Sequence, residues 1–358
     1  MRRIPNSCLV SAFPAQSGLG RSATNLFRLG LFEQAFFFKF HRSDPEAGYS
    51  RVVPSRWDRL GGAGAYASQY LPSAWKSALR PFDFVHFQSP HFFHLARTVR
   101  RATGTVHDML FFDTGRDHGY PRGSRAYFRG EFRRANELDG IATDSQQTQR
   151  AVAAMAPHLR TTVIPLWTDA AFKPRDRTRA RRDLGLPDDP VILLNVGSDV
   201  PRKNLEILPR IMNDLGKDFL LVRIGRSDRI RSAFHERNLL ALESVSDVQY
   251  PIFFNAADMV VQPSLEEGLG YPILEAINSG TPVLASDIQV FHELLGADYP
   301  FCLNPDSPAE WVAAARTVAG TSRTKAVMCE LYGHIGSYYH EERGMKDFEA
   351  FFREAGVL

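Results

Sequence analysis

Two glutamates, Glu267 and Glu275, stand eight positions apart in a segment suited to a ligand that carries both charge and hydroxyl groups. Glu267 lies in a glycine-bearing stretch, and Glu275 follows Pro272, a residue that helices tolerate best in their first turn. The start of a helix favours an anionic group, because its first N–H groups are unpaired and its dipole is positive there. Two carboxylates would repel a bare phosphate, but they can accept hydrogen bonds from hydroxyls. The segment is therefore expected to bind a sugar nucleotide.

Two adjacent cations, Arg202 and Lys203, form a second candidate group. They follow Val191–Val196, a run that is apolar except for Asn195 and is typical of a strand buried on both faces. Positive charges at the start of a helix oppose its dipole, so stability does not explain their position. They can instead neutralise a diphosphate, and arginine can bind two oxygens at once. Gly197 and Ser198, which directly follow the strand, are further candidates for contact with this anion.

The elements around the two glutamates are expected to form a strand, a loop, a short helix and another strand. Met259–Gln262 is an apolar, β-branched run that ends at Pro263. A helix is predicted from Pro272, at its first position, to Gly280, and Pro282–Ala285 supplies the next strand. In open α/β sheets ligands bind at the carboxyl ends of the strands. Glu267 is expected at such an end.

The segment PSLEEGLGYPILEAINSGTPV resembles the signature of retaining GT-B glycosyltransferases of the family 4 type, also called glycosyl transferases group 1. In that family the first glutamate of the E-x7-E pattern contacts hydroxyls of the transferred sugar, and the second binds the nucleotide ribose. The resemblance implies these roles for Glu267 and Glu275. The alternative is a solvated helix cap with two surface glutamates. The resemblance also implies donor contacts from the residues between them, Gly268, Leu269, Gly270 and Tyr271.

The cation group resembles a motif of the same family. VGSDVPRKN is similar to its diphosphate motif, although many members have arginine at the position of Ser198. The resemblance implies phosphate contacts for Arg202 and Lys203. Arg226 follows the next predicted strand, Phe219–Ile224, where the nucleotide base approaches in the family. It is expected to stack on the base or to contact a phosphate, with a plain surface arginine as the equal alternative.

Gly18, Gly20 and Ala23 match G-x-G-x-x-A, so dinucleotide binding must be weighed. The glycines lie several residues beyond the predicted strand Cys8–Ala12, and the next strand ends in histidine and arginine rather than an acid. The stretch SGLGRSATN instead resembles the N-terminal glycine loop of the family, which lies against the donor diphosphate and the acceptor. A helix is predicted after it, from about Arg21. Ordinary turn glycines are the alternative.

His107 is the third residue of the piece TVHDMLFF, which resembles the T-V-H-D strand end of the family. There the histidine lies near the transferred sugar, where it can donate to a hydroxyl or carry charge beside a phosphate. A strand is predicted to begin at Thr105 and to end at this histidine. The alternative is a histidine that is satisfied by its neighbours. The stretch IATDS resembles another family element, with Asp144 in place of the usual valine.

Charge is distributed unevenly along the chain. Residues 1–175 contain 24 Lys and Arg against 13 Asp and Glu, although the whole chain has a net charge of only +3. Within this half, Arg122, Arg125, Arg129 and Arg133 recur at helical spacing with aromatic residues beside them. A basic helix with aromatics can lie on an anionic membrane surface or bind an acidic acceptor. A solvated basic face is the alternative.

Length and composition restrict the class of protein. A chain of 358 residues with 44% hydrophobic and 23% charged residues is long enough for two globular domains. Its three cysteines lie far apart, which favours neither a disulfide framework nor a zinc site and suits a reducing cytosol. No run of about eighteen apolar residues predicts a membrane span. A cytoplasmic protein, peripheral on the inner face of the membrane, is expected.

The expected fold is α/β, of the GT-B type, with two Rossmann-like domains that face each other across a cleft. We expect an acceptor-side domain at residues 1–174 and a domain that binds the nucleotide sugar at 175–335. Residues 336–358 are expected to form a C-terminal helix that returns to the first domain. Pro174–Pro190, with its arginines and Pro/Gly breaks, is interpreted as the crossover between the domains.

The resemblance implies a retaining hexosyltransferase that needs no metal ion and no cofactor, with a nucleotide diphosphate sugar as co-substrate. GDP-mannose is slightly favoured, and UDP-glucose or a UDP-N-acetylhexosamine is the alternative donor. The acceptor is expected to be a glycan or a lipid-linked molecule rather than a nucleic acid. A sugar-nucleotide epimerase or phosphorylase of the same fold, or a non-catalytic protein that binds nucleotide sugars, remains the alternative function.

Overall fold

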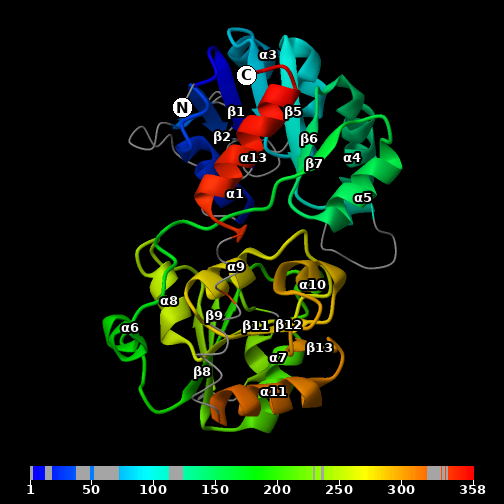
Figure 1. Ribbon diagram of the computed structural model, residues 1–358. Helices are drawn as coiled ribbons and strands as arrows, with labels where there is room; N and C mark the ends of the chain where they lie inside the picture. The colour runs from blue at the N-terminus through cyan, green and yellow to red at the C-terminus, as the bar shows by residue number, and fades with distance from the viewer. Residues whose placement is uncertain are drawn as a thin grey trace. The chain divides into compact units, whose positions relative to one another are not determined.

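The computed structural model describes residues 3–12, 18–37, 49–51, 72–112, 124–228, 230–234, 238–320, 332, 335 and 338–358. By their internal contacts these residues form two compact units (Figure 1). The first unit contains the described residues up to Trp167 together with Glu342–Leu358. The second contains those of Thr168–Glu341. Each unit is built on a sheet whose strand pairs are parallel.

The first unit has a seven-stranded sheet with the order β3-β2-β1-β4-β5-β6-β7. Its strands are β1 (Ser7–Ser11), β2 (Gln34–Phe37), β3 (Tyr49–Arg51), β4 (Phe84–Phe87), β5 (Arg101–Val106), β6 (Ile141–Thr143) and β7 (Thr161–Val163). Its helices are α1 (Gly18–Arg28), α3 (Pro72–Leu79), α4 (Ser124–Arg133), α5 (Gln146–Met155) and α13 (Glu341–Glu354), with 3-10 turns η2 (Pro90–Thr98), η3 (Leu110–Phe112) and η4 (Ala135–Glu137). In the register of the central pairs, Cys8 lies opposite Gln34 on one side and Val85 on the other.

The last helix, α13, packs on the sheet of the first unit, where Figure 1 shows it in red along the strands. Phe348, Phe351 and Phe352 recur at helical spacing and are at most 4% exposed. Phe352 lies edge-on to Phe32 and Phe84, with ring centroids 5.6 and 5.4 Å apart. Burial of each ring contributes about 2 kcal/mol. The prediction that the final helix returns to the first domain is confirmed.

The second unit has a six-stranded sheet with the order β10-β9-β8-β11-β12-β13. Its strands are β8 (Val191–Val196), β9 (Phe219–Ile224), β10 (Leu239–Leu242), β11 (Met259–Gln262), β12 (Val283–Ser286) and β13 (Cys302–Leu303). Its helices are α6 (Arg177–Leu184), α7 (Ile207–Leu215), α8 (Tyr250–Ala256), α9 (Tyr271–Asn278), α10 (Gln289–Leu295) and α11 (Pro308–Gly320), with 3-10 turns η5 (Pro201–Lys203) and η6 (Arg231–Ala233). The strand order reverses between β8 and β11, which creates a topological switch point.

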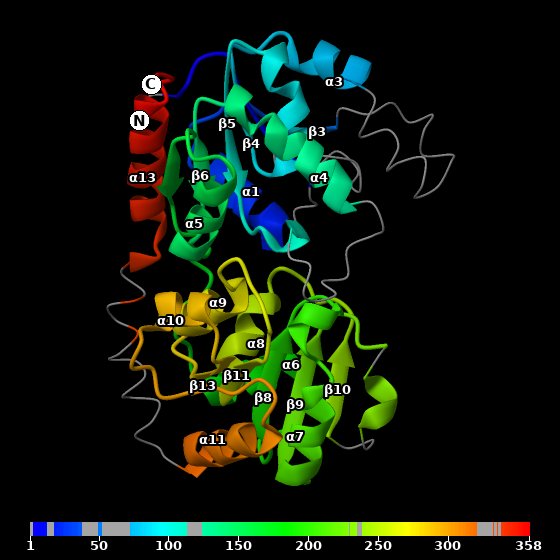
Figure 2. The same ribbon diagram turned by 90° about the vertical axis from the view of Figure 1, so that its right-hand side faces the viewer.

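The core of the second unit lies between its sheet and the helices that cover it. Figure 2 shows α7 and α11 next to each other, and the two helices are in contact. Ile211 and Met212 of α7 and Trp311 of α11 are each about 1% exposed and belong to one apolar cluster with Leu221 of β9. This packing holds the sheet rigid, so the loops at its carboxyl edge have a fixed base.

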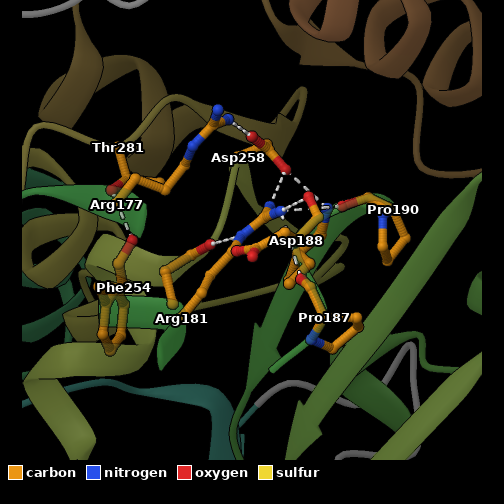
Figure 3. Close-up of polar contacts among 10 residues, drawn as sticks. Arg177, Arg181, Pro187, Asp188, Pro190, Phe254, Asp258 and Thr281 are labelled. Carbon is orange, nitrogen blue, oxygen red and sulfur yellow. Dashed lines mark hydrogen bonds and ion pairs between the residues drawn. The ribbon is translucent and has the colours of Figure 1, made fainter. Parts of the chain in front are cut away.

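Asp258 joins three elements at the amino edge of the second sheet (Figure 3). Its carboxylate accepts hydrogen bonds from the Ile192 N–H at 2.7 Å and from Arg181 Nη2 at 2.6 Å, and it also pairs with Arg177. Arg181, whose side chain is 4% exposed, donates to the carbonyls of Ala256 at 3.0 Å and Asp188 at 2.6 Å. Arg177, Arg181 and Asp258 form a polar node. This node holds α6 and the turn after it against the starts of β8 and β11.

Several predicted boundaries were wrong. α1 already begins at Gly18, because the first turn of a helix leaves N–H groups unpaired and tolerates glycine. β5 begins at Arg101 rather than Thr105, with Gly104 in its interior against the ring of Phe93. The helix after the cations begins at Ile207, not Leu205, because Pro201–Lys203 form a separate 3-10 turn.

Two further differences concern prolines and glycines. Pro272 is the second residue of α9 rather than the first. The expected crossover Pro174–Pro190 contains α6, which Asp176 caps by accepting from the N–H of Arg179 and which ends at Gly185 with a φ of +65°.

Among the described residues, no helix is both long and apolar enough to cross a membrane.

Candidate functional site

Two loops of the second unit meet at the switch point. One follows β8 and contains Gly197, Ser198 and the turn η5, and the other follows β11 and leads to α9. The N–H of Leu265 donates to the carbonyl of Arg202 at 2.8 Å, which ties the second loop to the first. Asn204 leaves η5 with a φ of +50°, and its side chain donates to the carbonyl of Pro305 at 2.9 Å. Both loops therefore have a defined shape at the sheet edge where ligands bind.

Glu267 is the centre of a buried polar cluster. Its carboxylate accepts from Arg202 Nη1 at 3.0 Å and forms an ion pair with Lys203 Nζ. Ser264 Oγ and Gln262 Nε2 donate to the Lys203-paired oxygen at 2.8 and 3.0 Å. The side chains of Glu267, Lys203 and Arg202 are 7%, 12% and 19% exposed. The structure thus brings together three residues that the sequence had placed in separate motifs.

The cluster carries a net positive charge, because two cations surround one carboxylate. Burial alone would raise the pKa of Glu267, but the charges of Lys203 and Arg202 and the hydrogen bonds of the cluster lower it to about 2. Burial lowers the pKa of Lys203, and Arg202 adds to this effect while Glu267 opposes it. Glu267 is therefore ionised at neutral pH, and the excess positive charge favours an anionic ligand.

Glu275 lies on α9 and is 1% exposed. Its Oε2 accepts from the hydroxyl of Tyr250 at 2.8 Å, and the Tyr250 ring lies edge-on to Phe172 and Phe254. The position is buried and hydrogen-bonded, so the alternative of a surface glutamate does not describe it.

The remaining donor-side residues follow the ends of the strands. Gly270, the N-cap of α9, has a φ of +111°, and a Cβ there would approach the Phe291 ring to 2.9 Å. Leu269 and Tyr271, beside it, are 3% and 9% exposed, and Gly268 precedes them in the same loop. Arg226 points to solvent with its side chain 75% exposed, where it pairs with Asp228 at 2.6 Å. In this structure it makes a surface ion pair.

His107, Gly18 and Gly20 lie in the first unit. His107 follows β5 and Asp144 follows the neighbouring strand β6. The Nδ1 of His107 is 2.7 Å from Asp144 Oδ2, and its Nε2 is 3.0 Å from the carbonyl of Gln88. Both ring nitrogens therefore face acceptors, an arrangement that suits the protonated imidazole. Gly18 and Gly20 belong to the first turn of α1.

The comparisons with known proteins agree with this geometry. The family model described as glycosyl transferases group 1 matches residues 176–326, which contain the whole cluster around Glu267. This segment, less than half of the chain, is similar to that family. The chain is 33% identical over 135 residues to the O-antigen chain mannosyltransferase RfbU of Salmonella typhimurium, an alignment that covers 35% of the chain and 37% of the relative. It is 30% identical over 237 residues to a D-inositol 3-phosphate glycosyltransferase of Pseudarthrobacter chlorophenolicus, covering 54% and 56%. The matches thus span about half, or less, of the length of these relatives.

Solved structures show the fold of the chain. Sucrose-phosphate synthase from Thermosynechococcus elongatus superposes with a TM-score of 0.77 at 18% identity, over 99% of this chain and 100% of that one. Anabaena HepE in complex with UDP and glucose gives a TM-score of 0.77 at 15% identity, over 97% and 99%. With the two parallel-sheet units, these neighbours show the GT-B fold that the sequence predicted.

The sequence patterns did not reveal several polar residues of the second unit. Gln262 and Ser264 were interpreted only as the end of a strand and a break, although a buried polar residue at the last position of an apolar strand is itself a signal. Tyr250, the partner of Glu275, and Arg223, inside β9, were not considered at all. Among the described residues, no group of three or more His, Cys, Asp or Glu side chains is arranged to hold a metal ion.

The His107–Asp144 pair makes the first prediction. Burial lowers the pKa of His107, but the charge and hydrogen bond of Asp144 outweigh it, so the pKa lies above the ordinary 6.5. The titration of His107 therefore contributes stability that is fully present below pH 6.5 while Asp144 is ionised, and that is lost as pH rises through the raised pKa. Asp144→Asn should bring the His107 pKa below 6.5, because burial lowers this pKa and the carboxylate charge that raises it is then absent.

The titration of the His107 ring signals by NMR measures this change directly. Asp139→Asn is the matched control, because Asp139 pairs with Arg101 at 2.8 Å in the same unit and does not contact His107. An unchanged His107 titration in Asp144→Asn would contradict the assignment.

Proposed function

We propose that this protein is a glycosyltransferase that moves a hexose from a nucleotide diphosphate sugar to an acceptor. The observation that carries the proposal is the buried cluster of Arg202, Lys203 and Glu267 at the switch point of the second sheet. Its net positive charge suits a diphosphate, and its carboxylate suits sugar hydroxyls. The match of residues 176–326 to the group 1 family model and the nucleotide-bound neighbour HepE support the same donor class.

The main demand of this reaction is to stabilise the negative charge that develops on the nucleoside diphosphate as it leaves. We assign this task to Arg202, to Lys203 and to the N–H groups at the start of α9. Glu267 would hold hydroxyls of the transferred sugar and Glu275 the ribose, as the family resemblance implies. We further propose retention of the anomeric configuration, with a donor phosphate oxygen accepting the acceptor proton.

We propose that the reaction needs neither a metal ion nor a cofactor. Transfer should therefore continue in the presence of EDTA at an unchanged rate. A loss of activity that Mg²⁺ or Mn²⁺ restores would contradict this part of the proposal.

GDP-mannose is the proposed donor, and the mannosyltransferase name of one relative supports it. UDP-glucose is the second candidate, because HepE was solved with UDP and glucose and also with UDP-glucose. A thermal-shift panel of GDP, UDP, ADP and their sugars separates the two. A nucleotide at a hundred times its Kd should add about 2.7 kcal/mol of stability.

Product assays then test catalysis. With the donor so identified, the protein should release the nucleoside diphosphate and form a product of retained anomeric configuration, visible by NMR, only when an acceptor is present. Conversion of the donor to an epimer without acceptor would indicate an epimerase. Binding without turnover for any of the acceptors tried, glycans and lipid-linked sugars included, would indicate a non-catalytic protein that binds nucleotide sugars.

The acceptor side is proposed to include an anionic surface, through helix α4. Arg125, Arg129 and Arg133 are exposed on this helix, and none of them pairs with a carboxylate among the described residues. Phe128 and Phe132 are each 5% exposed and pack on Phe111. The aromatics are therefore part of the core, so contact with a membrane would be electrostatic, without insertion of these rings. Arg122 lies outside the described residues.

Charge reversal tests this surface. Arg125→Glu, Arg129→Glu and Arg133→Glu combined should abolish most binding to vesicles that contain phosphatidylserine, because each arginine contributes about 1 kcal/mol near an anionic surface. The matched control reverses the exposed Arg179, Arg182 and Arg210 of the second unit, which changes net charge equally. Wild-type binding should weaken with salt. Equal binding of wild type to neutral and anionic vesicles in a sedimentation assay would contradict the proposal that α4 binds an anionic surface.

A further inference from the structure

Arg223 is a fully buried arginine in the sheet of the second unit. It occupies the last position but one of β9 and is 0% exposed, although arginine is almost never fully buried without a charged partner. Among the described residues no carboxylate lies within ion-pair distance of it. Burial lowers the pKa of Arg223 to about 10, with the charge of Asp199 opposing this effect, so the guanidinium is protonated at neutral pH. A buried cation of this kind requires an explanation.

The guanidinium is held by three backbone carbonyls. Nη1 donates to Ile224 at 2.7 Å, and Nη2 donates to Gly197 at 2.6 Å and to Arg226 at 3.2 Å. Gly197 directly follows the buried strand β8, and the other two residues lie at the end of β9 and just beyond it. The Nε of Arg223 is buried and has no acceptor among the described residues. The side chain thus connects the two strand ends that border the switch point.

These contacts fix the direction of nearby donors. A peptide is planar and trans, so a carbonyl that points to Arg223 turns the following N–H away from it. The N–H groups of Ser198 and Ser227 are therefore turned away from the guanidinium. Gly225 has a φ of +121°, and a Cβ there would lie 2.1 Å from the Gly197 oxygen, so only glycine permits this approach. Oriented N–H groups of this kind can bind an anion.

The charge of Arg223 also acts on the cluster around Glu267. It contributes, together with burial and Arg202, to the lowered pKa of Lys203. Arg202, Lys203 and Arg223 therefore share the carboxyl edge of the sheet near β8, β9 and β11 with the buried Glu267. Two of the cations pair with Glu267, whereas Arg223 contacts only carbonyls. Its charge, partly offset by that of Asp199, can act on an anionic ligand through space.

We propose that Arg223 is a positioning residue of the nucleotide site, which shapes the loops after β8 and β9 and adds a buried positive charge that favours a nucleoside diphosphate. This inference rests on the proposed donor function. It assigns to Arg223 a share of the affinity for the diphosphate part of the ligand and little of the affinity for the base and ribose.

The test compares ligands that differ in charge. Binding of a nucleoside and of its diphosphate is measured by calorimetry on wild type, Arg223→Met, Arg223→Lys and the control Arg210→Met, which removes an exposed arginine from α7. Arg223→Met should weaken diphosphate binding about tenfold, corresponding to about 1.4 kcal/mol, and nucleoside binding less than about twofold. Arg223→Lys should weaken diphosphate binding about threefold, because lysine keeps the charge but not the planar guanidinium that donates to several carbonyls at once. Arg210→Met should match wild type.

Other outcomes separate the two proposals. If Arg223→Met weakens the nucleoside and the diphosphate equally, or changes neither, the inference on Arg223 is overturned and the donor function stands. If wild type binds no nucleoside diphosphate, both are overturned. Thermal unfolding of each variant is recorded. Arg223→Gln, which keeps an amide donor for the Gly197 carbonyl without the charge, gives the same comparison if Arg223→Met does not fold.

Discussion

Lys203→Ala is expected to lower kcat/KM for sugar transfer about 100- to 1000-fold, the loss that follows removal of one preorganised group that stabilises developing negative charge. Lys203 is 12% exposed and pairs with Glu267 beside Arg202, so its charge acts in a site from which most water is excluded. The loss should fall mainly on kcat, because the charge on the leaving diphosphate is greater in the transition state than in the bound donor.

The matched control for this prediction is Lys217→Ala, an exposed lysine between α7 and β9, at the opposite edge of the same sheet. It should keep the wild-type rate. The pH dependence of stability adds a second check, because the pKa of Glu267 is lowered to about 2. The stabilisation from its ion pairs is present above the ordinary value of 4.5 and is lost only as pH falls through about 2. A Lys203→Ala enzyme within threefold of wild type would mean that the cluster is not the donor site.

Asp258→Ala is expected to lower the free energy of unfolding of the second unit by about 3–5 kcal/mol, the usual cost of breaking a buried ion pair by removal of one partner. The change leaves the guanidinium of Arg181, 4% exposed, without its carboxylate and the Ile192 N–H without its 2.7 Å acceptor. Arg181→Met together with Asp258→Ala should be less damaging than the aspartate change alone, because the uncompensated charge is removed.

Denaturant unfolding of the full chain measures this effect, and hydrogen exchange at Ile192 reports it locally. Asp183→Ala is the matched control. Asp183 lies on α6, as Arg181 does, but its side chain is 50% exposed and its contact with Arg179 is 4.0 Å long. It should change stability by less than about 1 kcal/mol. If Asp258→Ala were no more destabilising than Asp183→Ala, the node would not hold α6 to the sheet.

Three strands of the second unit, β8, β9 and β11, could be predicted to the residue, whereas β10 and β13 were not predicted. β8, β9 and β11 are short runs of apolar residues ended by glycine or proline, and such runs have few alternative structures. Glu267, Arg202 and Lys203 could be singled out because their charges stand beside those strand ends, where a purely structural sequence would not place them. The strand order then brings the two loops together.

The hydrogen-bond partners of individual residues could not be predicted, because hydrogen bonds between residues far apart in the chain leave little trace in one sequence. Asp144 was noted only as a departure from the family, whereas it lies 2.7 Å from His107. The periodicity of α4 placed arginines and aromatics near one another but did not show that Phe128 turns into the core. Arg223 interrupts an apolar strand, yet its role depends on carbonyls of the neighbouring strand end.

The central claim is that the cluster around Glu267 binds the diphosphate of a nucleotide sugar. Calorimetric titration of GDP and UDP into wild type, Lys203→Ala and Lys217→Ala tests it most directly. The account predicts that wild type and Lys217→Ala bind one of the two nucleotides with the same Kd, and that Lys203→Ala binds it at least about tenfold more weakly. Equal affinity of all three proteins for that nucleotide would contradict the account, as would the absence of binding to wild type.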